Sequence, residues 1–194
     1  MTLAETYLRR VRKVDPLLTP ALRFNPCTWH GPTRQNLPAL ISLIEGADGF
    51  AVSRTYLRPD GSGKADVATH EQRLMLGSAA GGHVPLKAGN GTLFVAEGLE
   101  TALSLPLLGM VGSAALWATL SAANMRSRRL PEKPSLLVIA ADGDEAGRSA
   151  GDALACRAIG LGWAVEIRPA PDGHDWNDVL VERLASTEVR AHGL

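Results

Sequence analysis

Four short apolar runs in the second half of the chain constrain its fold more than any other feature. They are residues 93–97 (LFVAE), 115–119 (ALWAT), 136–142 (LLVIAAD) and 164–170 (AVEIRPA). Each run is followed by a segment with helical character, and strands that alternate with helices need crossover connections. Such connections produce a parallel sheet that is covered on both faces. We therefore predict an α/β domain over residues 91–194, with a parallel sheet of about four strands flanked by helices.

The first 90 residues predict a small α+β region. Residues 2–14 have apolar side chains at helical spacing, and prolines at positions 16, 20 and 26 predict an irregular connection after them. Four later segments have the composition of extended strands: residues 39–45, 50–57, 73–77 and 83–87. We expect residues 1–90 to form a region distinct from the α/β domain.

Charge is distributed unevenly between these two regions. The chain has 20 basic and 20 acidic side chains, but residues 1–96 carry a net charge of +4 and residues 97–194 carry −4. Overall neutrality excludes a uniformly basic coat for nucleic acid, and the split raises the question of what the acidic half holds. Only two cysteines are present, and no apolar run approaches the roughly 20 residues of a membrane span. We expect a cytoplasmic protein without a membrane segment.

Acidic residues follow three of the four apolar runs. Glu97 closes the first run, Asp142 and Asp144 follow the third, and Asp175 and Asp178 follow the fourth. Because the carboxyl ends of parallel strands open on one edge of the sheet, we expect these carboxylates to gather there. Crowded carboxylates repel one another, and a divalent cation compensates that repulsion. The pattern predicts a metal site, although each cluster alone could equally be a helix cap or an ordinary loop.

Residues around the second cluster favour phosphate chemistry. Gly143 allows a tight turn between the two aspartates, and Gly147 allows a backbone or a phosphate to approach closely. Arg148 follows directly and is suitably placed for a phosphate oxygen. The loop is therefore a candidate for binding a phosphorylated substrate.

Three ordered motifs resemble those of Toprim domains: EGLETA at residues 97–102, DGDEAG at 142–147 and DWND at 175–178. The Toprim domain is the catalytic fold shared by bacterial-type (DnaG-type) primases, topoisomerases of types IA and II, and some nucleases. The motif wording is closest to the primases of phages and plasmids, and the resemblance covers about residues 91–185. Residues 54–65 (RTYLRPDGSGKA) also resemble the segment that precedes the Toprim domain in those primases.

This resemblance implies a role for each acidic residue. Glu97 corresponds to a general acid/base linked to the metal, and Asp142 and Asp144 correspond to the metal-binding pair. Asp175 and Asp178 match a later acidic motif that is associated with the metal site. The implied cofactor is Mg²⁺ or Mn²⁺.

Two residues depart from the Toprim motifs of primases, and a third could compensate for one of them. Thr101 stands where many bacterial primases have a further acid, and Glu100 could supply a carboxylate instead. His174 stands where a lysine is expected in the last motif. The sequence contains no GxxxxGK[ST] motif, which is the phosphate-binding loop of a helicase domain.

The expected function is that of a primase-like nucleotidyltransferase, which makes RNA primers on single-stranded DNA for replication of the phage or plasmid type. Its expected partners are the template, NTPs, and a replicative helicase or another replication protein. The basic first region is expected to contact nucleic acid and nucleotide. The candidate residues for these contacts are Arg54, Lys64, Arg73 and Lys87, together with Arg148 of the second region.

Two alternatives remain open at this point. A Toprim nuclease would use the same carboxylates to activate water instead of a 3′-hydroxyl. A non-catalytic module that binds nucleic acid or a partner would keep the Toprim shape alone. A topoisomerase is disfavoured, because it needs a catalytic tyrosine on a separate domain and the only tyrosines are Tyr7 and Tyr56.

Overall fold

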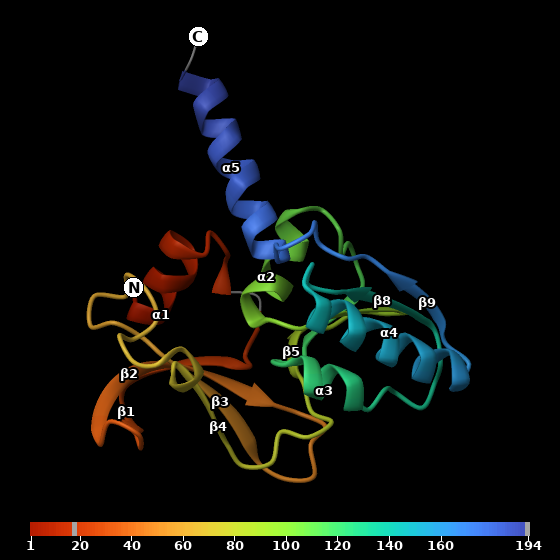
Figure 1. Ribbon diagram of the computed structural model, residues 1–194, viewed down its shortest axis with the longest axis horizontal. Coiled ribbons are helices and arrows are strands. Elements are labelled where there is room, and N and C mark those ends of the chain that lie inside the picture. Colours follow the sequence, from red (N-terminus) through yellow and green to blue (C-terminus); the bar gives the residue numbers. More distant parts are fainter. Residues whose placement is uncertain (17–18, 193–194) are drawn as a thin grey trace.

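A computed structural model describes residues 1–16 and 19–192, which form two sheets with helices around them (Figure 1). The first sheet is antiparallel, with four strands in the order β1-β2-β3-β4. Its strands are β1 (Leu22–His30), β2 (Gln35–Ile44), β3 (Ala51–Tyr56) and β4 (Arg73–Leu76). A short α1 (Leu3–Thr6) precedes it and continues as a π-helical turn over Tyr7–Val11, and a single 3₁₀ turn covers Thr69–Glu71.

The irregular connection predicted from the prolines is confirmed at Pro16 and Pro20 but was wrong at Pro26, which lies within β1. Pro26 lies at the point where the register between β1 and β2 shifts, between Asn25 and Thr28. A proline has no N–H to donate, and a bulge is one of the few places in a sheet that tolerates it. The predicted helix over residues 2–14 is also shorter, because regular helical structure ends at Val11 and Lys13 has a positive φ of 58°.

The second sheet has five strands in the order β5-β7-β6-β8-β9. Four of them are parallel, as the sequence predicts: β6 (Thr92–Ala96), β7 (Ala115–Ala118), β8 (Leu136–Ala140) and β9 (Ala164–Ile167). The fifth strand, β5 (Val84–Lys87), runs antiparallel to β7 at one edge. The sequence predicts an extended segment at residues 83–87 but assigns it to the N-terminal region, whereas the structure places it in this sheet.

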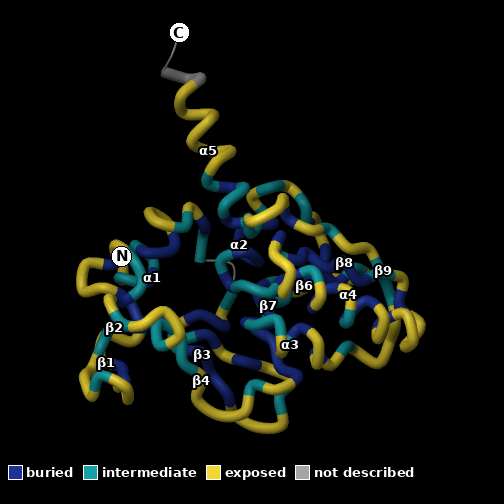
Figure 2. Tube along the Cα trace, in the orientation of Figure 1, coloured by how far each residue is buried: buried dark blue, intermediate teal, exposed yellow. Residues whose placement is uncertain are grey.

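Helices cover both faces of the second sheet (Figure 1). They are α2 (Leu99–Leu107), α3 (Ala122–Ser127), α4 (Glu145–Gly160) and α5 (Trp176–His192). Helices α3 and α4 cover one face, in a core that includes Met125, Leu154 and Trp163. Most of α5 is exposed, and the helix projects away from the rest of the molecule (Figure 2). None of the helices in the described ranges is long and apolar enough to cross a membrane.

The other face of the second sheet shares its core with the N-terminal region. This core includes Leu8 beside the first helix, Leu40 of β2, Leu103 of α2, Leu116 of β7 and Leu180 of α5. Because the same apolar cluster contains residues from both sheets, separating the sheets would expose apolar surface that is buried in the folded protein. The two regions therefore pack as one body.

A buried polar contact supports this junction near the start of β5. The ring of His83 stacks on Trp117, with centroids 3.7 Å apart, and the guanidinium carbon of Arg128 lies 4.7 Å from the Trp117 ring centroid. Arg128 also donates to the carbonyl of Gly81. Burial, assisted by the charge of Arg128, lowers the pKa of His83 to about 3. His83 is therefore neutral at physiological pH, and it packs as an aromatic side chain.

Candidate active site

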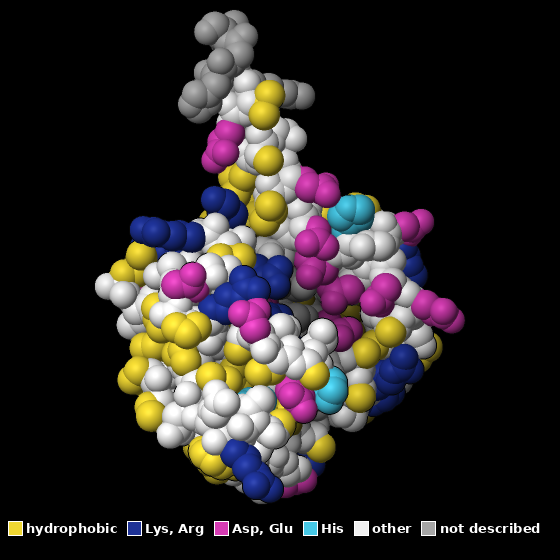
Figure 3. Space-filling model, turned by 60° about the vertical axis from the view of Figure 1, so that its left-hand side comes forward, with side chains coloured by type: hydrophobic (Ala, Val, Ile, Leu, Met, Phe, Trp, Pro, Cys, Tyr) yellow, Lys and Arg dark blue, Asp and Glu magenta, His cyan; other side chains and the backbone are white. Residues whose placement is uncertain are grey.

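The acidic residues gather at the carboxyl edge of the parallel strands, as the alternation of strands and helices predicts. Glu97 directly follows β6, and Asp142 follows β8 after one residue. The register pairs Ala96 with Ala140, so the ends of these two strands lie side by side. Figure 3 shows acidic side chains around a hollow, next to a group of basic side chains.

The pKa shifts show that these carboxylates act on one another. Burial raises the pKa of Asp142 to about 7, and the negative charges of Glu97, Asp175 and Asp144 add to the shift. The pKa of Glu97 is also raised, mainly by burial and further by the charge of Asp144, although the N–H of Ala122 opposes this. Four carboxylates therefore repel one another at this edge, and a positive charge there would relieve the repulsion.

The loop between Asp142 and Asp144 is held by close packing against the loop after β9. The backbone N–H of Gly143 donates to the carbonyl of His174 at 2.8 Å. A Cβ on Gly143 would overlap the carbonyl oxygen of Pro171, so only glycine fits there. This packing brings the third acidic motif toward the second. On the other side, the hydroxyl of Thr101 donates to Oδ1 of Asp142 at 3.4 Å.

Three of the aspartates also cap helices. Oδ1 of Asp144 accepts from the N–H of Gly147 at 2.6 Å, at the start of α4. Asp175 and Asp178 bond reciprocally at the start of α5: Oδ1 of Asp175 accepts from the N–H of Asp178 at 2.9 Å, and Oδ2 of Asp178 accepts from the N–H of Asp175 at 3.1 Å. These three aspartates therefore stabilise the starts of α4 and α5, whether or not they also bind metal. Neither the general-base prediction for Glu97 nor the metal predictions are tested by this geometry.

Two of the predicted basic residues reach the carboxylate edge. The charge of Arg73, on β4, acts on Glu97 and lowers its pKa. The ammonium of Lys64 lies 3.4 Å from Oε1 of Glu100, in the first turn of α2. Arg148 is occupied locally, because it donates to the carbonyl of Gly143 and forms an ion pair with Asp172.

The other two predicted basic residues lie elsewhere. Arg54 pairs with Leu74 in the register of β3 and β4, so it shares the face of Leu74 and lies opposite the face of Arg73. Its guanidinium donates to the carbonyls of Trp29 and Met75. Lys87 donates to the carbonyl of Ala114 at 3.0 Å, at the amino end of β7, which is the opposite edge of the sheet.

Two basic residues near the carboxylates were not among the predicted site residues. The charge of Arg126, on α3, lowers the pKa of Glu97. Arg12, which follows the π-helical turn, interacts electrostatically with Glu100 and Asp175. Arg126 could have been found from its position in the helix after the second apolar run, because that helix begins at the same edge as Glu97.

The donor set fits a hard divalent cation. All the side chains that converge are carboxylates, whose oxygens are the ligands that Mg²⁺ prefers. Within residues 1–16 and 19–192, no three Asp, Glu, His or Cys side chains lie close enough together to form a complete site. Mg²⁺ usually keeps several waters and binds through one or two carboxylates plus substrate phosphates, so a partial set of protein ligands is what it needs.

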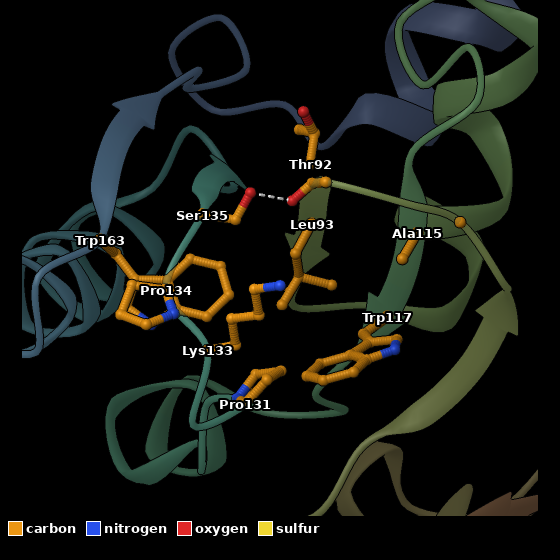
Figure 4. A pocket seen from close by; sticks show the side chains of 11 residues that line it. Thr92, Leu93, Ala115, Trp117, Pro131, Lys133, Pro134, Ser135 and Trp163 are labelled. Atoms are coloured by element: carbon orange, nitrogen blue, oxygen red, sulfur yellow. Dashed lines mark hydrogen bonds between the residues drawn. The ribbon is translucent and has the colours of Figure 1, made fainter.

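A pocket of about 360 Å³ lies at the other, amino edge of the parallel sheet (Figure 4). It is lined by aromatic and proline side chains with one lysine, including Trp117, Pro131, Lys133 and Trp163. No carboxylate and none of the predicted site residues lines it. The pocket is therefore separate from the carboxylate edge, where ligands of open parallel sheets bind.

Comparison with known families divides the chain at a similar place. Residues 92–186 match a family described as the Toprim domain, and residues 1–86 match a family described as a domain of unknown function (DUF7146). A search of curated proteins gives no match.

Among solved structures, the RNA polymerase domain of Mycobacterium tuberculosis primase DnaG, in complex with double-stranded DNA, has a similar fold. The TM-score is 0.56 at 18% identity, over 98% of this chain and 73% of that chain. A DNA primase domain from Pseudomonas aeruginosa gives 0.46 at 18% identity, over 88% of this chain. A second structure of the M. tuberculosis domain gives 0.49 at 19% identity, over 79% of this chain. This chain spans 56% and 55% of the lengths of these last two.

Proposed function

We propose that this chain, whose residues 92–186 form a Toprim domain, is a divalent-metal-dependent, primase-like nucleotidyltransferase. The observation that carries the proposal is the meeting of carboxylates at the edge of the parallel sheet, where burial and the charge of Glu97 raise the pKa of Asp142. The fold likeness to a primase domain that was solved with double-stranded DNA supports DNA binding. Primer synthesis on single-stranded DNA, for replication of the phage or plasmid type and with a replicative helicase as partner, belongs to the same proposal.

The proposed reaction assigns roles to the residues at this edge. One or two carboxylates of the set Glu97, Asp142 and Asp144, together with water and substrate phosphates, would hold Mg²⁺ or Mn²⁺, which when bound neutralises the triphosphate and lowers the pKa of the attacking hydroxyl. Glu97, whose pKa is raised, would accept the proton of the 3′-hydroxyl. The 3′-oxygen bonds to the α-phosphorus of the NTP, the bond from that phosphorus to the bridging oxygen breaks, and pyrophosphate leaves. Arg73 and Arg126 would contact phosphate oxygens.

The test is primer synthesis from NTPs on single-stranded DNA, with wild type compared with the double variant Asp142→Asn/Asp144→Asn. Asparagine caps a helix about as well as aspartate, so the start of α4 is preserved while two charges are lost. We expect the rate to fall by at least about a hundredfold, because charge stabilisation by a metal is worth several kcal/mol. Equal product from both proteins would overturn the proposal.

The matched control is Glu132→Gln, which removes an exposed carboxylate from the segment before β8, at the amino edge of the sheet. It is expected to prime at the wild-type rate. The same assay without NTPs tests the nuclease alternative, because metal-dependent nicking of DNA or RNA would then appear. Titration with Mg²⁺ or Mn²⁺ tests the binding-module alternative, which predicts no metal binding at millimolar concentration.

A further inference from the structure

Glu100 contacts side chains of the N-terminal region. It lies in the first turn of α2, three residues after Glu97, and only 12% of its side chain is exposed. The hydroxyl of Tyr7 donates to its Oε1 at 2.6 Å, and the ammonium of Lys64 lies 3.4 Å from the same atom. Its charge is therefore matched by groups from the first 90 residues, and not by a cation at the Asp142 loop.

A second cation joins the same contact. Nε of Arg12 donates to the hydroxyl of Tyr7 at 2.9 Å, so Tyr7 links this guanidinium to Glu100. The backbone carbonyl of Arg12 accepts from Nδ2 of Asn177 at 2.7 Å, which ties it to α5. Nδ2 of Asn177 also donates to Ser104 at 3.0 Å, which ties α5 to α2. The Glu100 junction, which we define as Tyr7, Arg12, Lys64, Glu100 and Asn177, thus connects the two regions beside the carboxylate edge.

The charge state of Glu100 follows from its surroundings. Burial alone would raise its pKa, but Lys64, the Tyr7 hydroxyl and Arg12 together lower the pKa to about 2. Glu100 is therefore ionised throughout the physiological range. A buried carboxylate that is already bound by two donors is poorly suited to hold a metal, which answers the suggestion that Glu100 replaces the acid missing at position 101.

The cations of the junction keep donors that can bind phosphate. An ammonium has three N–H donors, and the one ion pair of Lys64 within the described residues is to Glu100. The side chain of Lys64 is 27% exposed, so a ligand can reach it. Arg12 is close enough to Asp175 for the two charges to interact, which locates its guanidinium at the same edge.

We propose that Glu100 is a positioning residue: it holds Lys64 and Arg12 beside the carboxylate edge, where the two cations bind the triphosphate of the incoming nucleotide. This inference rests on the proposed nucleotidyltransferase function. A positively charged side chain that is fixed before binding loses less conformational entropy than a free one, so it binds phosphate more tightly. Glu100 thereby acts on affinity for the nucleotide and not on the chemical step.

The main test is equilibrium binding of Mg·GTP and Mg·ATP to the full chain, with wild type compared with Glu100→Gln. Glutamine keeps the size and the acceptor for Tyr7 but loses the charge that holds Lys64. We expect affinity to fall about tenfold, because the two cations are then no longer held in place before the triphosphate binds. In primer synthesis we expect KM for NTP to rise by a similar factor while kcat changes less than about threefold.

A double variant separates positioning from a general loss of structure. In the Lys64→Ala background, Glu100→Gln is expected to lower affinity by a smaller factor than it does in wild type, because only Arg12 is then left for Glu100 to hold. Additive losses would mean that Glu100 acts independently of Lys64, and they would overturn the proposal. Glu166→Gln is the matched control, since it breaks an exposed ion pair with Arg168 on β9 and is expected to bind NTP like wild type.

The outcomes distinguish this inference from the function on which it rests. If wild type binds NTP and makes primers but Glu100→Gln binds equally well, only the positioning role of Glu100 is overturned. If wild type binds no NTP, both proposals are overturned. If Glu100→Gln does not fold, Glu100→Asp takes its place, because it keeps the charge but shortens its reach; it is expected to show a smaller loss of affinity, and unchanged affinity overturns the proposal.

Discussion

At the scale of single residues, the crowding of carboxylates at the sheet edge is expected to lower the free energy of unfolding of the metal-free protein. Asp142 has its pKa raised to about 7 by burial and by three other carboxylates. A group whose pKa is higher in the folded protein than in the unfolded chain binds its proton more tightly when folded. Protonation of Asp142 therefore favours the folded protein. Its contribution to the free energy of unfolding is fully present below about pH 4, near the pKa in the unfolded chain, and it is lost as the pH rises through 7. In the absence of metal, the charge on Asp142 therefore opposes folding at pH 8.

This leads to a prediction for Asp142→Asn in metal-free protein. We expect its free energy of unfolding at pH 8 to exceed that of wild type by about 2 kcal/mol, a figure reduced from the full pKa shift because the side chain is partly in contact with solvent. The gain is expected to shrink toward zero near pH 4, where wild type is protonated. Urea unfolding with a chelator present, at several pH values, measures this difference.

The control for that measurement is again Glu132→Gln, whose exposed carboxylate is expected to give no pH-dependent gain. Adding Mg²⁺ is expected to stabilise wild type more than Asp142→Asn, because the variant lacks a charge that the cation would neutralise. A gain for Asp142→Asn that stays constant from pH 4 to pH 8 would show that repulsion is not its cause.

At the scale of elements, the sequence predicts strands and helices better than it predicts which face a residue occupies. The four parallel strands follow from apolar runs of 5 to 7 residues between helical segments, and all four strands are present. The sequence could not show that Arg54 and Arg73 lie on opposite faces of the first sheet. Their faces depend on the register of β3 against β4, which is set by long-range pairing. Strand β1 was missed because Pro26 favours a turn when only the local sequence is considered, and the bulge that accommodates it depends on pairing with β2.

The start of α5 gives a prediction at this scale. Asp175→Ala is expected to lower the free energy of unfolding by about 1 kcal/mol, since it removes the acceptor for the N–H groups of Asn177 and Asp178. Asp175→Asn is expected to stay within about 0.5 kcal/mol of wild type, because asparagine also caps helices. Urea unfolding compares the three proteins.

Measurements of activity distinguish two roles of Asp175, which are capping of α5 and the effect of its charge on Asp142. Because the charge of Asp175 acts on Asp142, Asp175→Asn is expected to need a higher Mg²⁺ concentration for half-maximal primer synthesis, although its helix is intact. If Asp175→Asn has the metal dependence of wild type, Asp175 serves only as a cap and is no part of the metal site.

At the scale of the whole molecule, the domain division visible in sequence does not correspond to two independent cores. Two family matches meet between residues 86 and 92, yet one apolar cluster contains side chains from both sides of that point. Strand β5 precedes residue 91 and belongs to the second sheet. The sequence could not reveal this, because an antiparallel edge strand has no periodic signal that distinguishes it from a strand of the first sheet.

The shared core predicts a single cooperative unfolding transition. Amide hydrogens in β2 and in β6, one strand from each sheet, are expected to exchange through global opening with free energies that agree within about 1 kcal/mol. Native-state hydrogen exchange followed by mass spectrometry measures both. The exposed end of α5 serves as the internal control, because it should exchange with a much lower free energy. If β2 opens several kcal/mol more easily than β6, the two regions unfold separately.

The short outer strands of the second sheet have a consequence for how copies of this chain behave together. A sheet edge with free N–H and C=O groups can pair with another chain and start aggregation. Strand β5 contains Pro85, which has no N–H, and the carbonyl of Pro85 already accepts from the hydroxyl of Thr19 at 2.7 Å. Strand β9 has only four residues and places Glu166, paired with Arg168, on its exposed surface. Both edge strands therefore disfavour pairing with another chain. The protein is expected to remain free of aggregates at concentrations at which a protein with an unprotected sheet edge would aggregate.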